Sequence, residues 1–305
     1  MIHRLYKSKV RHMAGLGTLF LTLFYAGNSY SRPDMTPLGL NIADTGSAYY
    51  HFSVKTFDSA DGKRHYKVWT GIPDKTPPAG GYSVLYMLDG NAVMDKLSDP
   101  LLKKLSQHNP PVLIAIGYQT KLPFDVVARA YDYTPPDKER GSGYTLSGRG
   151  RTGGGSRLFK HLLETTIAPQ AEKDLRINAD KRGLWGHSYG GLFVLDAYLS
   201  TNFFTRYYSA SPSLGQGYFS LLSEMEAKAK TQAGTRQLTL MEGDGDARKN
   251  RQNGAPAVLS AVSNTVNTLR ADGASAAYRL YPGLSHGQMF TASLETVLLQ
   301  VSTDR

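Results

Sequence analysis

The sequence predicts an α/β fold in which a mostly parallel β-sheet is flanked by helices on both faces. Strand-like and helix-like segments alternate along most of the chain, as expected when a crossover helix follows each parallel strand. The apolar run Pro111–Tyr118 is typical of a strand that is buried on both faces. With 305 residues, of which 41% are hydrophobic and 20% charged, the chain is long enough for one such domain.

The individual elements follow from composition and apolar runs, and we expect them in one domain over residues 40–305. Strands are predicted at His65–Pro73, Tyr82–Gly90, Pro111–Tyr118, Arg182–Ser188, Arg206–Ser213, Arg236–Ala247 and Ala276–Gly287. Helices are predicted at Ala92–Ser106, Ser156–Leu175, Gly190–Ser200, Leu221–Thr231, Ala255–Arg270 and Met289–Val301. The second helix is expected to break or bend at Pro169, and residues 119–155 are expected to form a long loop.

The N-terminal segment, residues 1–31, has the features of an export signal. No acidic residue precedes Asp34, and four basic residues open the segment: Arg4, Lys7, Lys9 and Arg11. The apolar run Met13–Ala26 follows, and it is shorter than the roughly 20 residues that a membrane-spanning helix needs. We therefore expect export to the periplasm, with the segment either cleaved or retained as an anchor in the inner membrane.

Composition excludes several kinds of site. The chain has no cysteine, which excludes disulfides, thiolate metal sites and a cysteine nucleophile, and we expect no metal or other cofactor. Four of its ten net positive charges belong to the N-terminal segment, so the exported part carries +6. Nucleic acid is not an expected partner, because no basic helix or aromatic–basic alternation is present. An anionic small substrate fits the charge better, and a plain solubility charge fits it equally well.

A G-x-S-x-G pattern, Gly186-His187-Ser188-Tyr189-Gly190, lies between a predicted strand and a predicted helix. In such a strand–turn–helix, small residues on both sides let the serine occupy a sharp, strained turn with its hydroxyl exposed. A second glycine, Gly191, adds space where helix and strand pass closely. This context predicts the α/β-hydrolase fold, with Ser188 as its nucleophile rather than as a serine of an ordinary turn.

The predicted general base is His286. In this fold the histidine follows the serine and the acid and lies near the C-terminus. Of the eight histidines, only His187 and His286 lie in the motif or after Ser200. The His187 side chain is expected to point away from the hydroxyl and to support packing. His286 lies in a glycine-flanked loop, and we expect it to take the Ser188 proton and return it to the leaving group.

The third member of a triad stays open at the level of sequence. Three carboxylates, Glu242, Asp244 and Asp246, follow the predicted strand that begins at Arg236. Any of them could orient the imidazole of His286. The spacing singles out none, so a Ser–His dyad is an alternative to a triad.

An oxyanion hole needs two backbone N–H groups, one of them from the residue after the nucleophile. That residue is Tyr189. The second donor is expected in the loop after the Tyr82–Gly90 strand, with Asn91 as the first choice and Asp89 as the alternative. Taken alone, the Asp89–Asn91 segment would be an ordinary turn.

Five segments, in this order, resemble the enterochelin-esterase-like α/β hydrolases. They are Tyr86–Asn91, Arg129–Pro135, Gly153–Arg176, Gly183–Ser200 and Tyr281–Gly287. The match runs from about residue 40 to the C-terminus. Together with the basic, apolar N-terminus, the chain is most similar to the periplasmic salmochelin and enterobactin trilactone esterases.

The resemblance implies a serine esterase that hydrolyses the trilactone ester bonds of catecholate siderophores, enterobactin and salmochelin, to linear forms. It favours a dyad of Ser188 and His286 and implies that Arg129 binds a catecholate arm of the substrate. Arg129 also lies in the long loop after a strand, on the side where ligands bind in open α/β sheets. A structural ion pair with Asp125 or Asp132 is the alternative for Arg129.

Two other functions are compatible with the same residues. One is a different exported carboxylesterase or acyltransferase of this fold, of the feruloyl or mycolyl type, because a fold does not determine a substrate. The other is a non-catalytic siderophore-binding protein. The intact pair Ser188 and His286 argues against the second alternative.

Overall fold

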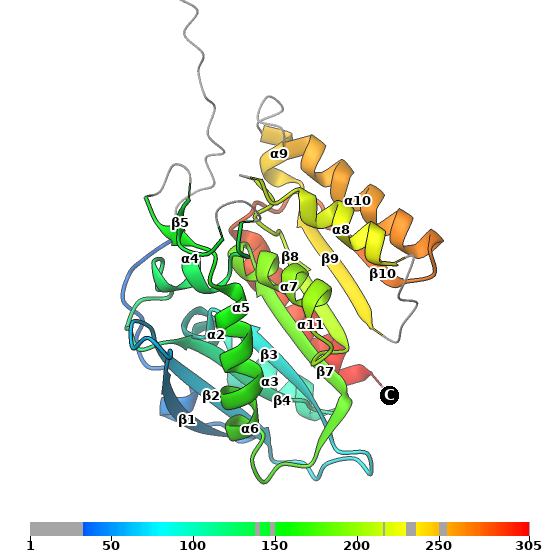
Figure 1. Cartoon of the computed structure of the whole chain (residues 1–305). Coiled ribbons are helices and arrows are strands. Elements are labelled where there is room, and N and C mark those ends of the chain that lie inside the picture. The colour runs from blue at the N-terminus through cyan, green and yellow to red at the C-terminus, as the bar shows by residue number, and fades with distance from the viewer. Residues whose placement is uncertain are drawn as a thin grey trace, which may run out of the picture.

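The computed structural model describes residues 33–137, 141–146, 150–215, 217–229, 236–249 and 255–304, so the predicted export segment lies outside it. A sheet of eight strands forms the centre of the described part (Figure 1). In spatial order its strands are β1 (Tyr50–Asp58), β2 (His65–Pro73), β4 (Val112–Tyr118), β3 (Tyr82–Leu88), β7 (Ile177–His187), β8 (Arg206–Ala210), β9 (Gln237–Gly243) and β10 (Ser275–Tyr281).

The predicted fold class is confirmed, because the six strands from β4 to β10 run parallel to their neighbours. Only β1 and β2 are antiparallel, at one edge of the sheet. The central strands β3 and β4 are buried along their whole length, as expected for parallel strands covered on both faces. Strand β1 was not predicted, because its side chains are mostly exposed and only pairing with β2 places it in the sheet.

Helices cover both faces of the sheet (Figure 1). One face carries α5 (Ser156–Leu162), α7 (Tyr189–Ser200), α8 (Ser220–Ala229) and α10 (Ala255–Ala271). The other carries α2 (Gly90–Lys96), α3 (Asp99–Ser106) and α11 (Gln288–Thr303). Alternate residues of β3 serve the two faces: Tyr86 and Leu88 pack toward the first, and Leu85 and Met87 toward the second.

Two predicted helices are interrupted. The single helix expected over Ala92–Ser106 is wrong, because α2 ends at Lys96 and α3 begins at Asp99 with a proline in its first turn. The break expected at Pro169 takes the form of a π-helical turn, Leu163–Ile167, followed by α6 (Ala168–Ala171). Proline lacks the N–H that a regular helix would use at this point.

Short elements complete the described part. The long loop expected over residues 119–155 contains α4 (Ala128–Asp132) and a two-stranded sheet of β5 (Tyr144–Thr145) and β6 (Thr152–Gly153). Two further short helices are α1 (Ile42–Thr45) and α9 (Gly245–Lys249). None of the helices in the described ranges combines the length and the apolar character that crossing a membrane requires.

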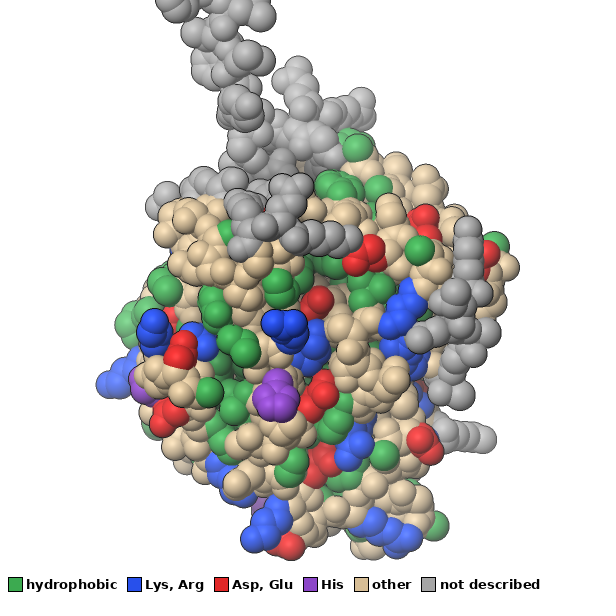
Figure 2. Space-filling model, viewed as in Figure 1, with side chains coloured by type: hydrophobic (Ala, Val, Ile, Leu, Met, Phe, Trp, Pro, Cys, Tyr) green, Lys and Arg blue, Asp and Glu red, His purple; other side chains and the backbone are tan. Residues whose placement is uncertain are grey.

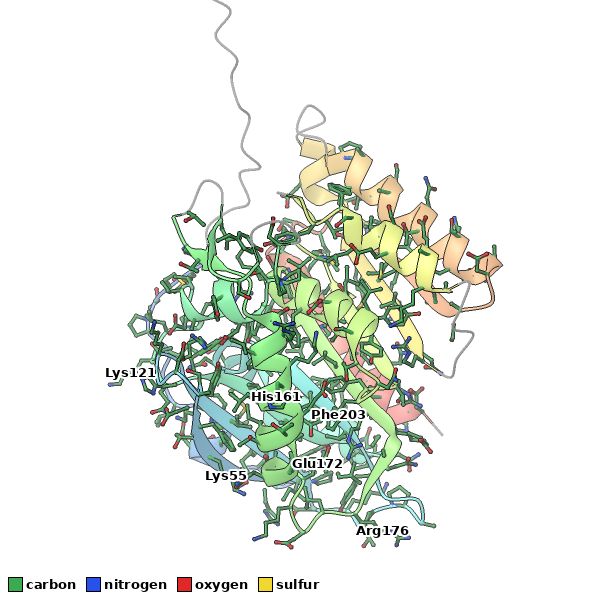
Figure 3. The ribbon with its side chains drawn as sticks, in the orientation of Figure 1. Lys55, Lys121, His161, Glu172, Arg176 and Phe203 are labelled. Atoms are coloured by element: carbon green, nitrogen blue, oxygen red, sulfur yellow. The ribbon has the colours of Figure 1, made fainter. Side chains whose placement is uncertain are left out.

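The two ends of the parallel strands differ in character. The carboxyl ends lie beside α4 and α9, in the upper part of Figure 1, and the predicted site residues follow these ends. Figure 3 shows Glu172, Arg176 and Phe203 at the opposite end, where β7 and β8 begin. There the Glu172 carboxylate accepts partly buried hydrogen bonds from Arg182 and from the Tyr86 hydroxyl, and none of the predicted site residues lies at this end. The site is therefore at the carboxyl end, as in other open α/β sheets.

Candidate active site

Ser188 occupies the sharp turn between β7 and α7. Its backbone has φ 60° and ψ −115°, a conformation that costs a non-glycine residue on the order of 1–3 kcal/mol. A Cβ atom at Gly186 would lie 2.4 Å from the Gly190 carbonyl group, and one at Gly191 would lie 2.7 Å from the Ala210 oxygen. Only glycine fits at these two positions, so Gly186 of the motif and Gly191 just after it make the turn sterically feasible.

His286 lies with its imidazole against the Ser188 hydroxyl. The distance from His286 Nε2 to Ser188 Oγ is 3.0 Å, although the residues are 98 positions apart in the chain. This distance is within the hydrogen-bond reach that a general base needs. The structure therefore brings together the two residues that the sequence predicted as nucleophile and base.

His187 packs behind His286 rather than beside the nucleophile. Its Nε2–H donates to the His286 carbonyl oxygen at 2.8 Å, and its ring lies against both the His286 ring and Phe290. The pKa of His187 lies well below its usual value near 6.5. Burial of the ring is the larger cause, and the nearby His286 imidazole is the next. A neutral His187 is thus a packing and hydrogen-bonding support for the loop that carries His286.

Two of the three candidate acids bind the backbone of the histidine loop. The Asp246 carboxylate accepts the backbone N–H of His286 at 2.7 Å. The Asp244 carboxylate accepts the N–H of Gly283. Both side chains thereby fix the course of the loop, and the contact of Asp246 is with the backbone of His286 rather than with its ring.

Glu242 faces away from this loop. It alternates along β9 with Met241, and it shares its face with Leu238 and Leu240, which pack under the helices of the α7 side. Burial raises the pKa of Glu242 to about 8, and a hydrogen bond with Ser211 lowers it only in part. Strand alternation therefore places Glu242 on the α7 side of the sheet.

The predicted oxyanion donors lie at the starts of two helices. Tyr189 is the first residue of α7 and Asn91 the second residue of α2, positions whose N–H groups have no partner within their own helix. The Asp89 N–H donates to the Tyr133 hydroxyl at 3.2 Å, so Asp89 is the less suitable alternative. The Asn91 side chain exchanges hydrogen bonds with the Tyr118 backbone, which fixes the start of α2 on the end of β4.

Arg129 forms a buried ion pair with Asp89. Its Nε and Nη2 donate to the two carboxylate oxygens at 2.7 and 2.8 Å, and the side chains are 10% and 1% exposed. The guanidinium also lies 5.4 Å from the ring centroid of Tyr189, the residue after the nucleophile. Asp89 has the left-handed φ of 57°, which is unusual for a non-glycine residue, and the pair holds its side chain in this turn.

The partner of Arg129 is thus neither of the two expected acids. Asp132 instead forms an ion pair with Arg64 and accepts hydrogen bonds from the hydroxyls of Tyr66 and Tyr118. Asp125 accepts the backbone N–H groups of Val127 and Ala128, where α4 begins. A guanidinium neutralised by a buried carboxylate is a weak ligand for an anionic substrate arm. The ion pair lets Arg129 position the Asp89 turn, and the contact with a catecholate arm that the resemblance implies stays a prediction.

Charged side chains of both signs are spread over one face of the described part of the chain. Figure 2 shows basic and acidic side chains interspersed on the face that carries α5 and α7, so the positive charge is not gathered there. Within the described ranges no group of three or more His, Cys, Asp or Glu side chains is arranged to hold a metal ion.

One site residue carries no signal in the sequence. Ser213, three residues after the end of β8, has its Oγ 3.0 Å from Ser188 Oγ. Serine and proline in this segment are ordinary turn residues, and only the distance in the folded chain singles Ser213 out.

The family model described as putative esterase matches residues 59–300 of the chain. The chain belongs to this esterase family. This chain is 52% identical over 303 residues to the apo-salmochelin esterase of Escherichia coli O6:H1. The match covers 99% of this chain and 95% of that relative. The resemblance drawn from five segments of sequence is thereby confirmed.

Solved structures and a more distant relative agree with this placement. The structure of the enterobactin hydrolase IroE in complex with DFP matches this chain with a TM-score of 0.77 and 52% sequence identity. The match covers 86% of the esterase and 99% of that chain. The ferri-bacillibactin esterase BesA of Bacillus subtilis is 32% identical, over 53% of the esterase and 58% of BesA.

Proposed function

We propose that this esterase hydrolyses the ester bonds of catecholate siderophore trilactones, enterobactin and salmochelin, to linear forms. The observation that carries the proposal is the 3.0 Å contact between Ser188 Oγ and His286 Nε2 at a strained turn. The substrate class rests on the 52% identity, over nearly the whole chain, to a protein named apo-salmochelin esterase. A solved relative with 52% identity is described as an enterobactin hydrolase.

The first half of the reaction forms an acyl-enzyme. His286 Nε2 takes the proton of Ser188 while Ser188 Oγ attacks an ester carbonyl of the trilactone ring. The carbonyl oxygen becomes an oxyanion, for which the N–H groups of Tyr189 and Asn91 are the proposed donors. When the intermediate collapses, the ring ester bond breaks and the departing alkoxide takes the proton from His286.

The second half releases the product. A water molecule gives a proton to His286 and attacks the acyl carbon, and Ser188 leaves with the electron pair of the bond that breaks. His286 returns the proton to Ser188 Oγ, so the enzyme regains its starting state. In this scheme Asp246 acts only through the backbone of His286, and the reaction runs on a dyad of Ser188 and His286.

We also propose that the esterase works in the periplasm, carried there by residues 1–31. The support is the pattern of that segment: basic residues first, then an apolar run, with no acidic residue before Asp34. Retention of the segment as an inner-membrane anchor would keep the enzyme beside the membrane, and cleavage would release it. Expression of the full chain followed by cell fractionation and N-terminal sequencing distinguishes the two.

Product analysis with enterobactin tests the activity. Wild-type protein and Ser188→Ala are incubated with the iron-free and the ferric siderophore, and the products are separated by chromatography with mass detection. We expect linear trimer and shorter fragments from the wild type only, and faster from the iron-free form, since the similar relative is named for that form. Cleavage of a simple aryl ester without cleavage of enterobactin would overturn the substrate assignment.

A further inference from the structure

The segment after β8 is bound to the nucleophile turn through the backbone. The Ser188 N–H donates to the Ala210 oxygen at 2.9 Å, and the Ser213 N–H donates to the Ser188 carbonyl oxygen at 3.1 Å. Ser211 has the left-handed φ of 41°, and its N–H donates to the Met241 oxygen at 2.8 Å. Backbone hydrogen bonds thus place Ser213 beside Ser188 whatever its side chain.

The hydroxyl that this segment presents contacts the reacting atom. Ser213 Oγ lies 3.0 Å from Ser188 Oγ, and His286 Nε2 lies 3.0 Å from the same oxygen. A serine hydroxyl has one proton to donate and two lone pairs to accept with. If Ser188 donates its proton to His286, as a general base requires, then Ser188 Oγ accepts the hydroxyl proton of Ser213.

We propose that Ser213 is a further catalytic residue of the proposed esterase reaction, on which this inference rests. Its hydroxyl donates a hydrogen bond to Ser188 Oγ and stabilises the negative charge on that oxygen. The charge develops twice: when His286 removes the Ser188 proton during attack, and when Ser188 Oγ leaves the acyl carbon with the electron pair of the broken bond. Ser213 keeps its own proton throughout, and the proton that moves is the one shared by Ser188 and His286.

The expected size of the effect follows from the kind of hydrogen bond. A hydrogen bond to a charged group contributes more than one between neutral groups, and its loss in a transition state lowers a rate about 10- to 100-fold. Ser213→Ala removes the hydroxyl and keeps the backbone N–H that donates to Ser188, so the turn retains its anchors. Ser213→Thr keeps a hydroxyl at the same carbon.

The test uses two reagents that require Ser188 but no siderophore. One is p-nitrophenyl acetate, which reports both half-reactions, and the other is diisopropyl fluorophosphate, which reports only the attack by Ser188. We expect Ser213→Ala to lower kcat, kcat/KM and the rate constant of phosphorylation about 10- to 100-fold, and Ser213→Thr to stay within about threefold of wild type. Thermal unfolding verifies that both variants fold.

Ser209→Ala is the matched control. Ser209 is buried on β8, and its hydroxyl donates to the Gly191 carbonyl oxygen at 2.9 Å, close to the site but not to Ser188 Oγ. We expect both rates to remain within about threefold of wild type in this variant, which separates a contact with the nucleophile from a general loss of a nearby hydroxyl.

Three results would overturn the proposal. They are wild-type rates in Ser213→Ala, a Ser213→Thr variant as slow as Ser213→Ala, and an equal loss in Ser209→Ala. A protein that reacts with both reagents but leaves enterobactin intact would remove the proposed substrate and leave the role of Ser213 standing. A wild-type protein inert to both reagents would remove the nucleophile and this inference with it.

Discussion

The rings of His187 and His286 lie tilted against each other, with centroids 4.7 Å apart, and the side chain of His187 donates to the backbone carbonyl of His286 at 2.8 Å. The residue before the nucleophile thereby supports the residue that acts as its base. Asp246 binds the same residue from its N–H side. His286 is thus held by both of its backbone polar groups, which restricts where its ring can lie.

We predict that His187→Ala lowers kcat about 10-fold with little change in KM. The support of the base is lost, while no group that contacts substrate is removed. Steady-state kinetics on an aryl ester measures this, and His187→Gln, which keeps a donor, should recover part of the loss. A larger change in KM than in kcat would show that His187 acts on the substrate instead.

Ser188→Ala and His286→Ala should each lower turnover on the order of a million-fold, because nucleophile and base act as one unit. His65→Ala is the control, since this histidine is largely exposed on β2 and far from the site in the sheet order. Hydrolysis of enterobactin and thermal unfolding are measured together. Retention of a tenth of the activity in either site variant would contradict the dyad.

No single alanine substitution at Glu242, Asp244 or Asp246 should be as damaging as His286→Ala. Asp246→Ala is expected to be the most severe of the three, because it removes the acceptor of the His286 N–H, with a loss of about 10- to 100-fold in kcat. The three variants are compared under the same conditions. One that is as inactive as His286→Ala would establish a full triad.

Arg129→Ala should destabilise the fold by about 3–5 kcal/mol, because it leaves the Asp89 carboxylate buried without its cation. Lys96→Ala is the control, since its ion pair with Asp95 is exposed and should contribute at most about 1 kcal/mol. Chemical denaturation measures both.

The same substitution separates the two roles of Arg129. We expect similar losses of kcat/KM on enterobactin and on a small neutral ester, because the pair with Asp89 shapes the turn used by both substrates. A loss confined to enterobactin, mainly through KM, would instead support direct binding of a catecholate arm.

Glu242→Gln should change how stability depends on pH. The folded carboxyl has a pKa of about 8, whereas the unfolded carboxyl releases its proton near the ordinary value of 4.5. The folded state therefore binds the extra proton between these values, and the wild type loses stability as the pH rises through this window, by up to about 1.4 kcal/mol per unit.

The glutamine variant lacks this titration. The difference between its unfolding midpoint and that of the wild type should therefore shift in favour of the variant as the pH rises from 5 to 8. Glu295→Gln, at an exposed position of α11, is the control. A difference between Glu242→Gln and wild type that does not change with pH would contradict a carboxyl protonated in the folded state.

The sequence by itself determined the features that depend on neighbouring residues. The turn at Ser188 is largely local, because Gly186 leaves room for Gly190 within a single strand–turn–helix, and the five-residue pattern is therefore recognisable in the sequence. The buried central strands are equally local, since an apolar run such as Val112–Tyr118 requires cover on both faces. His286 followed from the chain order of the fold.

Only the tertiary structure decided which distant residues meet. Arg129 forms its ion pair with Asp89 and not with Asp125 or Asp132. The Asp246 carboxylate accepts the backbone N–H of His286. The hydroxyl oxygen of Ser213 contacts that of Ser188. Each contact joins segments that follow different strands, so it depends on the order of the strands in the sheet rather than on spacing along the chain. The edge strand β1 was missed for the same reason, since its hydrogen bonds to β2, and not its exposed side chains, place it in the sheet.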